Sequence, residues 1–328
     1  MNTIIPNRLQ PGDEIRVIAP STTHRIISEE NAKQAISTFE KLGLKVTYGK
    51  NIMATSALLT APIEKRIEDL HDAFLDSKVK GIFSTIGGFT SNQLLKYLDY
   101  ELIRDNPKIF CGYSDITALQ NAIYTKTGLV TFSGPAFSSL GMKKGLDYTL
   151  EYFKKVLMED CEVELKPSLH WSNDMWYQNQ ENREFIPNSG YKVIHEGSAA
   201  GRLIGGNLCT FNLLQGTEFM PSLENSILFL EDDSEVNART FDRDLQSLIH
   251  QPGFSGVKGI VIGRFEKASH FSDEELRYVI QTKEELRNLP VVVNADFGHT
   301  TPIFTFPIGG KCEVDAQKGR VSIKIANQ

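Results

Sequence analysis

Short apolar strands and amphipathic helices alternate along the first half of the chain. Strand-like segments at residues 14–20, 44–49 and 79–88 are separated by helical patterns, and further strand-like segments follow at 109–111 and 128–135. Parallel strands need long crossover connections, which helices supply. The pattern therefore predicts an α/β fold in which helices cover both faces of a mostly parallel sheet.

This alternation stops between about residues 160 and 195. The segment there is polar and holds both tryptophans of the chain, which is typical of a linker or a long functional loop. We therefore expect an N-terminal domain at 1–165, a linker or substrate loop at 166–190 and a C-terminal α/β domain at 191–328. Within the second domain, residues 201–214 are interpreted as a glycine turn that leads into a helix.

Composition excludes several classes of partner. The 328 residues carry a formal net charge of −6, whereas a nucleic-acid-binding face is basic, so nucleic acid is not an expected partner. No segment reaches the roughly 18 apolar residues of a membrane span, and the N-terminus lacks the pattern of a secretory signal. The four cysteines are scattered without a CxxC pair, which favours a reducing cytoplasm.

The stretch "IFCGYSDITALQ" (109–120) predicts a sharp turn from a buried strand into a helix, with Ser114 at the turn. Such a turn lifts the serine hydroxyl out of the sheet and directs helical N–H groups, beginning near Asp115, toward anything that the serine attacks. Gly87 and Gly88 end a neighbouring strand and can bring another backbone N–H close, because glycine has no Cβ. Isolated from other evidence, Ser114 would rather be interpreted as a helix N-cap, where serine is common.

Two further residues with suitable chemistry lie at strand ends. A serine hydroxyl needs an imidazole to take its proton, and the imidazole needs a carboxylate to orient it. Glu231 and His299 both end predicted strands, and ligands bind beyond the carboxyl ends of parallel strands. Asp232 and Asp233 are rivals for the role of Glu231. With an unperturbed imidazole, activity is expected to fall as His299 protonates around pH 6.5.

Five motifs then appear in a fixed order along the chain: "IGGFTSNQLL" (86–95), "GYSDIT" (112–117), "GGNLCTFNLLQGT" (205–217), "LFLEDDSE" (228–235) and "DFGHTTP" (296–302). Together they resemble the LD-carboxypeptidase family of serine peptidases, which includes the microcin C immunity peptidases of the MccF type. The resemblance spans nearly the whole chain.

This resemblance implies a fold, a site and an assembly. The fold is a flavodoxin-like parallel N-terminal domain with a second, swivelling and barrel-like α/β domain at the C-terminus. The site is a catalytic triad of Ser114, Glu231 and His299, with an oxyanion hole formed by the backbone N–H groups of Gly88 and Asp115. Gly87 belongs to the same glycine pair and is expected to contact substrate. A cytoplasmic location and usually a homodimer are implied as well.

Two substrates compete within the family: a murein tetrapeptide, trimmed during cell-wall recycling, and a peptidyl-nucleotide in which an aspartyl residue is joined to a nucleotide-like amide. "HWSNDMW" resembles the tryptophan-bearing loop of the MccF type, and an exposed indole offers a nucleobase a stacking face. Trp171 is therefore a candidate for substrate binding, with packing as the alternative. Asn207 is a second candidate, which either orients substrate or caps the following helix.

A different class of protein also fits two α/β domains, namely a non-catalytic receptor for small molecules, in which Ser114 and Glu231 would merely hydrogen-bond a ligand. The glycine fingerprints of dinucleotide and phosphate-loop sites are missing, and no HExxH motif or cluster of Cys and His occurs. We therefore expect no cofactor and no metal, and we predict a serine hydrolase that acts on an amide.

Overall fold

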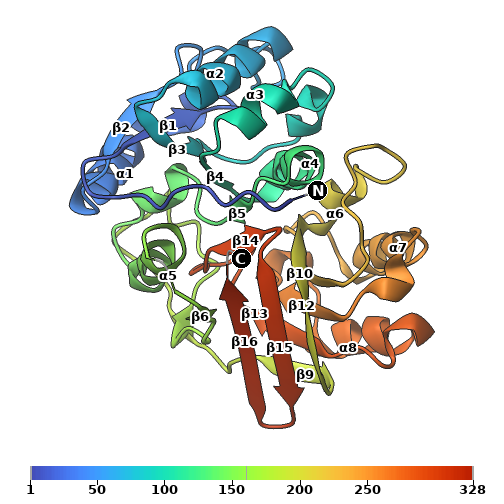
Figure 1. Cartoon of the computed structure of the whole chain (residues 1–328). Coiled ribbons are helices and arrows are strands. Elements are labelled where there is room, and N and C mark those ends of the chain that lie inside the picture. Colours follow the sequence, from blue (N-terminus) through green and yellow to red (C-terminus); the bar gives the residue numbers. More distant parts are fainter. Residues whose placement is uncertain (1, 160, 327–328) are drawn as a thin grey trace.

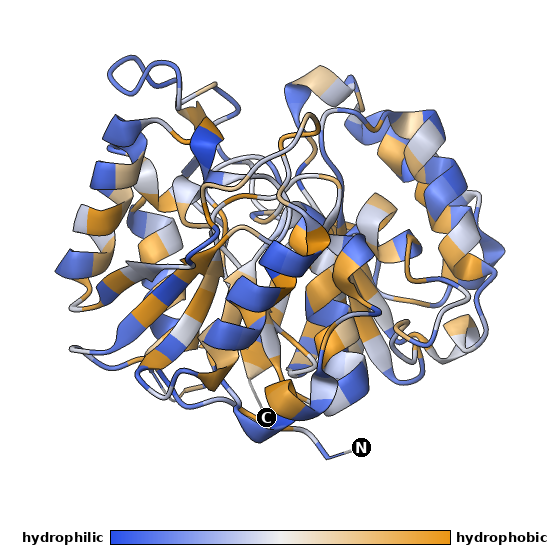
Figure 2. Ribbon diagram, turned by 90° about the horizontal axis from the view of Figure 1, so that it is seen from above, coloured by the Kyte–Doolittle hydropathy of each residue, from blue (hydrophilic) through white to orange (hydrophobic). Residues whose placement is uncertain are grey.

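The computed structural model describes residues 2–159 and 161–326, and its main feature is a pair of α/β halves, each built on its own sheet (Figure 1). The N-terminal half lies above the C-terminal half in that view, and both chain ends lie near the middle. Figure 2 shows apolar residues along the strands and the inward faces of the helices, with hydrophilic residues on the outer helix faces. None of the helices in the described ranges is long and apolar enough to cross a membrane.

The N-terminal sheet has the strand order β14-β5-β4-β3-β1-β2. Its first five strands along the chain are parallel and follow the 2-1-3-4-5 order of flavodoxin-like folds, as predicted, while β14 joins the edge antiparallel to β5. The strands are β1 (Glu14–Ile18), β2 (Lys45–Tyr48), β3 (Val79–Ser84), β4 (Ile109–Gly112), β5 (Thr131–Ser133) and β14 (Phe306–Ile308). The helices of this half are α1 (Glu29–Lys41), α2 (Ile63–Leu75), α3 (Tyr100–Asp105), α4 (Thr117–Thr127) and α5 (Asp147–Leu157).

The C-terminal sheet is mixed and has the order β6-β16-β15-β10-β11-β12-β13-β9. Its four central strands, β10 to β13, are parallel, and antiparallel strands flank them on both sides. The strands are β6 (Val163–Glu164), β9 (Lys192–His195), β10 (Gly197–Asn207), β11 (Ser226–Glu231), β12 (Gly259–Gly263), β13 (Val291–Ala295), β15 (Lys311–Gln317) and β16 (Arg320–Ala326). The helices are α6 (Leu208–Asn212), α7 (Ala238–Ile249) and α8 (Asp273–Gln281).

Shorter elements complete the described chain. A two-stranded sheet of β7 (His170–Trp171) and β8 (Ile186–Pro187) lies within the predicted substrate loop. The 3-10 helices are η1 (His24–Ile26), η2 (Ser91–Leu94), η3 (Ser114–Ile116), η4 (Ser138–Gly141), η5 (Phe254–Gly256), η6 (Lys267–Ser269) and η7 (Glu284–Leu286).

The glycine turn expected at the start of segment 201–214 is wrong, although the helix that follows it is correct. Residues 201–207 are instead the second half of β10, which pairs with β11. A side chain at Gly205 would bring its Cβ within 2.3 Å of the Phe229 carbonyl oxygen, so glycine permits the close approach of β11. Gly205 therefore marks a tight strand contact and not a turn, and Gly206, whose Cβ would lie 2.5 Å from Thr117 Oγ1, leaves room for the start of α4.

Direct hydrogen bonds join the two halves close to the end of β10. The Asn121 side chain in α4 donates from Nδ2 to the Gly205 carbonyl at 2.8 Å, and the Asn207 backbone N–H donates to Thr117 Oγ1 at 3.0 Å. Two strands also pair with the sheet of the opposite half: β14 joins the N-terminal sheet, and β6, just before the expected boundary at residue 165, joins the C-terminal sheet. These links hold the carboxyl ends of the two sets of parallel strands near one another.

Candidate active site

The predicted turn from strand to helix at Ser114 is present between β4 and α4, through the 3-10 helix η3. Ser114 has φ +63°, a left-handed conformation that costs a non-glycine residue energy and is concentrated at functional sites. A side chain at Gly112 would bring its Cβ within 2.4 Å of Ser84 Oγ, so the strand end tolerates only glycine there. The result is a strained elbow of the kind that exposes a nucleophile above a sheet.

The structure brings the three predicted triad residues together from both halves of the chain. His299 Nε2 lies 2.9 Å from Ser114 Oγ, and His299 Nδ1 lies 2.7 Å from Glu231 Oε2. Because an ionised carboxylate only accepts hydrogen bonds, Nδ1 carries the proton of the neutral imidazole and Nε2 accepts from the serine hydroxyl. The order of groups is therefore hydroxyl, imidazole and carboxylate.

Glycine residues make room for the carboxylate of Glu231 at the end of β11. A Cβ at Gly298 would lie 2.5 Å from Glu231 Oε2, and one at Gly263 would lie 2.8 Å from Glu231 Cβ. Gly298 also has φ +104°, which only glycine adopts readily. The residue before His299 therefore has to be glycine for the imidazole and the carboxylate to meet.

The rival carboxyl of Asp232 points elsewhere. It is fully buried, and its Oδ1 accepts a hydrogen bond from Asn207 Nδ2 at 3.1 Å. Burial, together with the neighbouring charge of Glu231, raises the pKa of Asp232 to about 8, so this carboxyl is largely protonated at neutral pH. The carboxyl group that contacts His299 is thus that of Glu231.

Burial of His299 disfavours its cation, but the charge and hydrogen bond of Glu231 outweigh that effect. They raise the pKa of His299 to about 9, well above the value of an unperturbed imidazole. Asp233 and Glu266 add to the increase through their charges. The sequence led us to expect that activity falls around pH 6.5, the pKa of an isolated imidazole. The carboxylates around His299 raise that pKa, so activity should fall at a higher pH.

The backbone of Gly87 lies close to the serine hydroxyl and to the Asp115 nitrogen. A side chain at Gly87 would place its Cβ 3.0 Å from Ser114 Oγ and 3.6 Å from the Asp115 nitrogen, so the missing side chain leaves open the space between them. Gly88 follows with φ +146°. Within the described part of the chain, neither the Gly88 N–H nor the Asp115 N–H is paired with an acceptor. These two donors remain available to a negatively charged oxygen.

Trp171 and Asn207 have different surroundings. Trp171 lines a cavity of about 490 Å³, and its ring centroid lies 5.0 Å from Arg264 Cζ and 5.8 Å from Lys267 Nζ. Asn207 is only 2 % exposed, and its Oδ1 accepts from the Thr210 N–H at 3.0 Å, which caps α6. The capping interpretation of Asn207 is therefore confirmed, while a contact between either residue and substrate stays a prediction.

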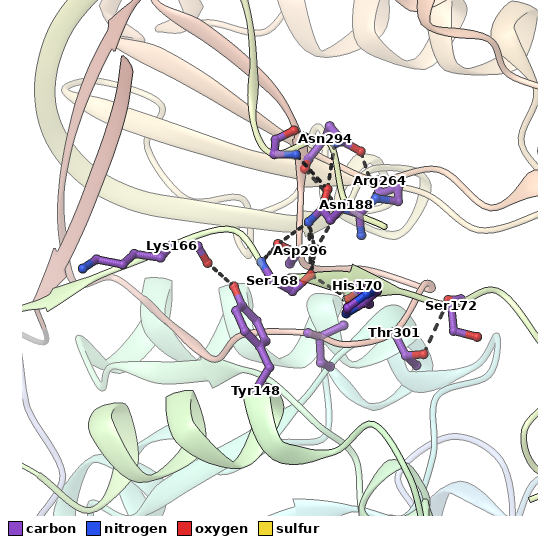
Figure 3. Close-up of polar contacts among 12 residues, drawn as sticks. Tyr148, Lys166, Ser168, His170, Ser172, Asn188, Arg264, Asn294, Asp296 and Thr301 are labelled. Carbon is purple, nitrogen blue, oxygen red and sulfur yellow. Dashed lines mark hydrogen bonds and ion pairs between the residues drawn. The ribbon is translucent and has the colours of Figure 1, made fainter. Parts of the chain in front are cut away.

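Asp296 is a residue that the sequence patterns did not single out, although it lies in the motif that ends at His299. This buried carboxylate accepts from the Ser168 N–H at 2.8 Å, from Asn188 Nδ2 at 3.3 Å and from Arg264 Nη2 at 2.8 Å (Figure 3). Ser168 and Asn188 lie near the two ends of the predicted substrate loop. Asp296 therefore ties both ends of that loop to the segment that carries His299.

A second connection joins the same loop to the chain beyond the histidine. The Ser172 N–H donates to the Thr301 carbonyl at 2.7 Å, and the Thr301 N–H donates back to the Ser172 carbonyl at 3.0 Å. Since Trp171 precedes Ser172, the backbone beside Trp171 is joined to the chain two residues beyond His299. Among the described residues, no group of three or more His, Cys, Asp or Glu side chains is arranged to hold a metal ion.

A hydroxyl, an imidazole and a carboxylate joined in this order, contributed by two α/β halves, form the arrangement that defines serine hydrolases. Comparison with known families gives a more specific assignment. Residues 15–134 match the model of the LD-carboxypeptidase N-terminal domain, and residues 200–314 match that of the C-terminal domain. The chain belongs to the LD-carboxypeptidase family, peptidase family S66.

The names of similar proteins agree with this family, and they indicate more than one substrate. YocD, a candidate carboxypeptidase of Bacillus subtilis (strain 168), is 54% identical over 97% of this chain and 98% of its own. The microcin C7 self-immunity protein MccF of Escherichia coli is 32% identical over 96% of this chain and 94% of its own. A "Probable murein peptide carboxypeptidase" of Bacillus subtilis (strain 168) is 31% identical over 94% of this chain and 91% of its own.

Solved structures agree with the fold. The crystal structure of an MccF-like protein from Bacillus anthracis is 52% identical, with a TM-score of 0.98 over 99% of this chain and 100% of the other. A structure of MccF in complex with aspartyl sulfamoyl adenosine is 31% identical, with a TM-score of 0.88 over 99% of each chain.

Proposed function

We propose that the protein is a serine peptidase in which Ser114 attacks an amide carbonyl. His299 accepts the hydroxyl proton at Nε2 and then delivers it to the leaving amine, while Glu231 stays ionised and holds the imidazole. The observation that carries this proposal is the unbroken relay from Ser114 Oγ through the imidazole to Glu231, at 2.9 and 2.7 Å. The left-handed backbone of Ser114 supports it, because strain of this kind concentrates at functional sites.

The N–H groups of Gly88 and Asp115 stabilise the tetrahedral oxyanion in this proposal, and Gly87 leaves the space that the carbonyl oxygen enters. The reaction passes through an acyl-enzyme on Ser114, which water hydrolyses with His299 again acting as base. Each oxyanion donor of this type is worth roughly 10²–10³ in kcat in other enzymes. A cytoplasmic location and a homodimer belong to the same proposal.

For the substrate, we propose an amide between a C-terminal aspartyl residue and a nucleotide-like group, as expected for the MccF type. The support is the cavity of about 490 Å³ beside the site, where the indole of Trp171 is accompanied by the cationic side chains of Arg264 and Lys267. An aromatic face with neighbouring positive charge suits a nucleotide, which has a flat base and an anionic linkage. A murein tetrapeptide is the second candidate, since a relative named as a probable murein peptide carboxypeptidase is as similar as MccF.

Replacing Trp171 with alanine tests which of these two compounds the site is built to bind. Trp171→Ala should raise KM for aspartyl-sulfamoyl adenosine roughly 5- to 100-fold, since stacking on a base is worth about 1–3 kcal/mol. Trp171→Phe keeps an aromatic face and should lose less. KM for a murein tetrapeptide should change less than about threefold. Tyr278→Ala, which removes a ring that is 70% exposed on α8, serves as the control. Equal losses on both substrates would contradict a base-stacking role for Trp171.

The pH dependence of kcat/KM reports the protonation of His299. Only the neutral imidazole accepts the serine proton, so activity should be lost as pH falls through the pKa of His299, which the carboxylates raise to about 9. We expect kcat/KM to rise between pH 7 and pH 9, with a midpoint clearly above 6.5. Glu266→Gln removes one of the charges that raise this pKa and should move the midpoint to lower pH. A midpoint at or below 6.5 in the unaltered protein would contradict this account of the electrostatics.

A further inference from the structure

The carboxylate of Asp115, the residue after Ser114, is buried but lies outside the proton relay. Its Oδ2 accepts from Ser21 Oγ at 2.5 Å and from the Ser91 N–H at 2.8 Å, and Ser91 Oγ donates back to the Asp115 carbonyl at 2.6 Å. Asp115 is 2% exposed, and both serines are fully buried. A buried carboxylate is costly unless it is well paired, so its presence here needs a reason.

Ser21 connects this carboxylate to the glycine pair. Ser21 Oγ accepts from the Thr90 N–H at 3.3 Å, while the Thr22 N–H donates to the Gly87 carbonyl at 3.3 Å. A side chain at Gly88 would put its Cβ 2.4 Å from Ser21 Oγ, so the Gly88 backbone lies directly against this hydroxyl. The loop after β1 therefore fills the gap between the Asp115 side chain and the Gly88 backbone.

Arg66 forms hydrogen bonds to the same loops. This residue of α2 is 3% exposed, and its Nη1 donates to the Pro20 carbonyl and to the Thr90 carbonyl, both at 3.0 Å. The positive charge of Arg66 also interacts with the negative charge of Asp115. One buried cation and one buried anion thus fix the loops on either side of Gly87 and Gly88.

We propose that Asp115, Ser21 and Arg66 are positioning residues that hold the backbone N–H groups of Gly88 and Asp115 in register with Ser114. The inference rests on the proposed function, because it assigns to these side chains the geometry of the proposed oxyanion hole. Oxyanion donors act only when they are fixed before the reaction, and a misplacement of 1 Å costs roughly 10²-fold in rate. This requirement supplies the reason for burying charged groups beside the elbow.

The test compares kcat, KM and fluorophosphonate labelling rates in variants of the full-length protein. Asp115→Ala should lower kcat roughly 10²–10³-fold with KM changed less than about threefold, because the donors act mainly on the transition state. Asp115→Asn keeps an oxygen that accepts from Ser21 and Ser91, so it should retain at least a tenth of kcat. Ser21→Ala should lower kcat roughly 10- to 100-fold. The labelling rate should fall in parallel, since the phosphonyl oxygen occupies the same hole.

Ser226→Ala is the control, because Ser226 is also a fully buried serine whose hydroxyl donates a hydrogen bond, to the Leu223 carbonyl, and it lies far along β11 from Glu231. It should lower the melting temperature without changing kcat. If Ser21→Ala and Asp115→Ala likewise change only the melting temperature, the positioning role is overturned while the serine mechanism stands. If Ser114→Ala retains normal turnover, the proposed function itself fails.

Discussion

Ser114→Ala should lower turnover by roughly 10⁴- to 10⁶-fold, because it removes the atom that attacks the carbonyl and leaves His299 without a proton to accept. The residual rate should exceed the rate in water, since the oxyanion donors and the binding surface remain. Turnover of aspartyl-sulfamoyl adenosine and of a murein tetrapeptide, followed by chromatography, measures the loss. Near-normal turnover of the preferred substrate would reject Ser114 as the nucleophile.

Ser114→Gly is a useful companion to this variant. Both substitutions remove the hydroxyl, but only glycine adopts the φ of +63° without strain. The glycine variant should therefore be equally inactive and should melt at a higher temperature than the alanine variant. The opposite order of melting temperatures would show that the backbone of this turn is not strained in the way that we infer.

Glu231→Gln should lower kcat roughly 10⁴-fold, although the side chain keeps its size. The amide can donate a hydrogen bond to His299 Nδ1, and the imidazole proton then lies on Nε2. A protonated Nε2 can no longer accept the proton of Ser114. The rate of hydrolysis and the melting temperature are measured together, so that an inactive enzyme is distinguished from an unfolded one.

Asp232→Asn is the matched control for Glu231→Gln. Asp232 is the adjacent residue and is also buried, but its oxygen accepts from Asn207 and not from the imidazole. An amide oxygen accepts that hydrogen bond equally well, so kcat should stay within about tenfold of the unaltered value. A large loss in Asp232→Asn with a small loss in Glu231→Gln would exchange the roles of these two residues.

The sequence was sufficient for the mostly parallel N-terminal sheet, while its flavodoxin-like arrangement was implied by the family resemblance. Strand ends are readable from apolar runs, and the carboxyl ends of parallel strands lie together, so Ser114, Glu231 and His299 were expected to meet. The choice of Glu231 over Asp232 needed the direction of each side chain at the strand end, which no pattern of residue types encodes. Motif resemblance, and not periodicity, suggested that choice.

Other features were beyond the sequence for physical reasons. Gly205 and Gly206 look like a turn because glycine favours turns, whereas here Gly205 admits the backbone of β11 and Gly206 admits the side chain of Thr117. The contact of Ser21 with Asp115 and that of Arg66 with the Pro20 carbonyl join residues far apart in the chain, and neither Ser21 nor Arg66 lies in a motif that indicates chemistry. Asp296 lies in one of the family motifs, but its hydrogen bonds to both ends of the substrate loop depend on the tertiary fold.

Mass spectrometry of the protein after reaction with a fluorophosphonate probe tests the central claim most directly. The probe reacts with a serine only when a base activates its hydroxyl and donors hold the resulting oxyanion. The relay from Ser114 to Glu231 predicts a single adduct on the peptide that contains Ser114, absent from Ser114→Ala and greatly slowed in His299→Gln. An unlabelled protein, or an adduct that persists in Ser114→Ala, would contradict the account and favour a receptor that only binds its ligand.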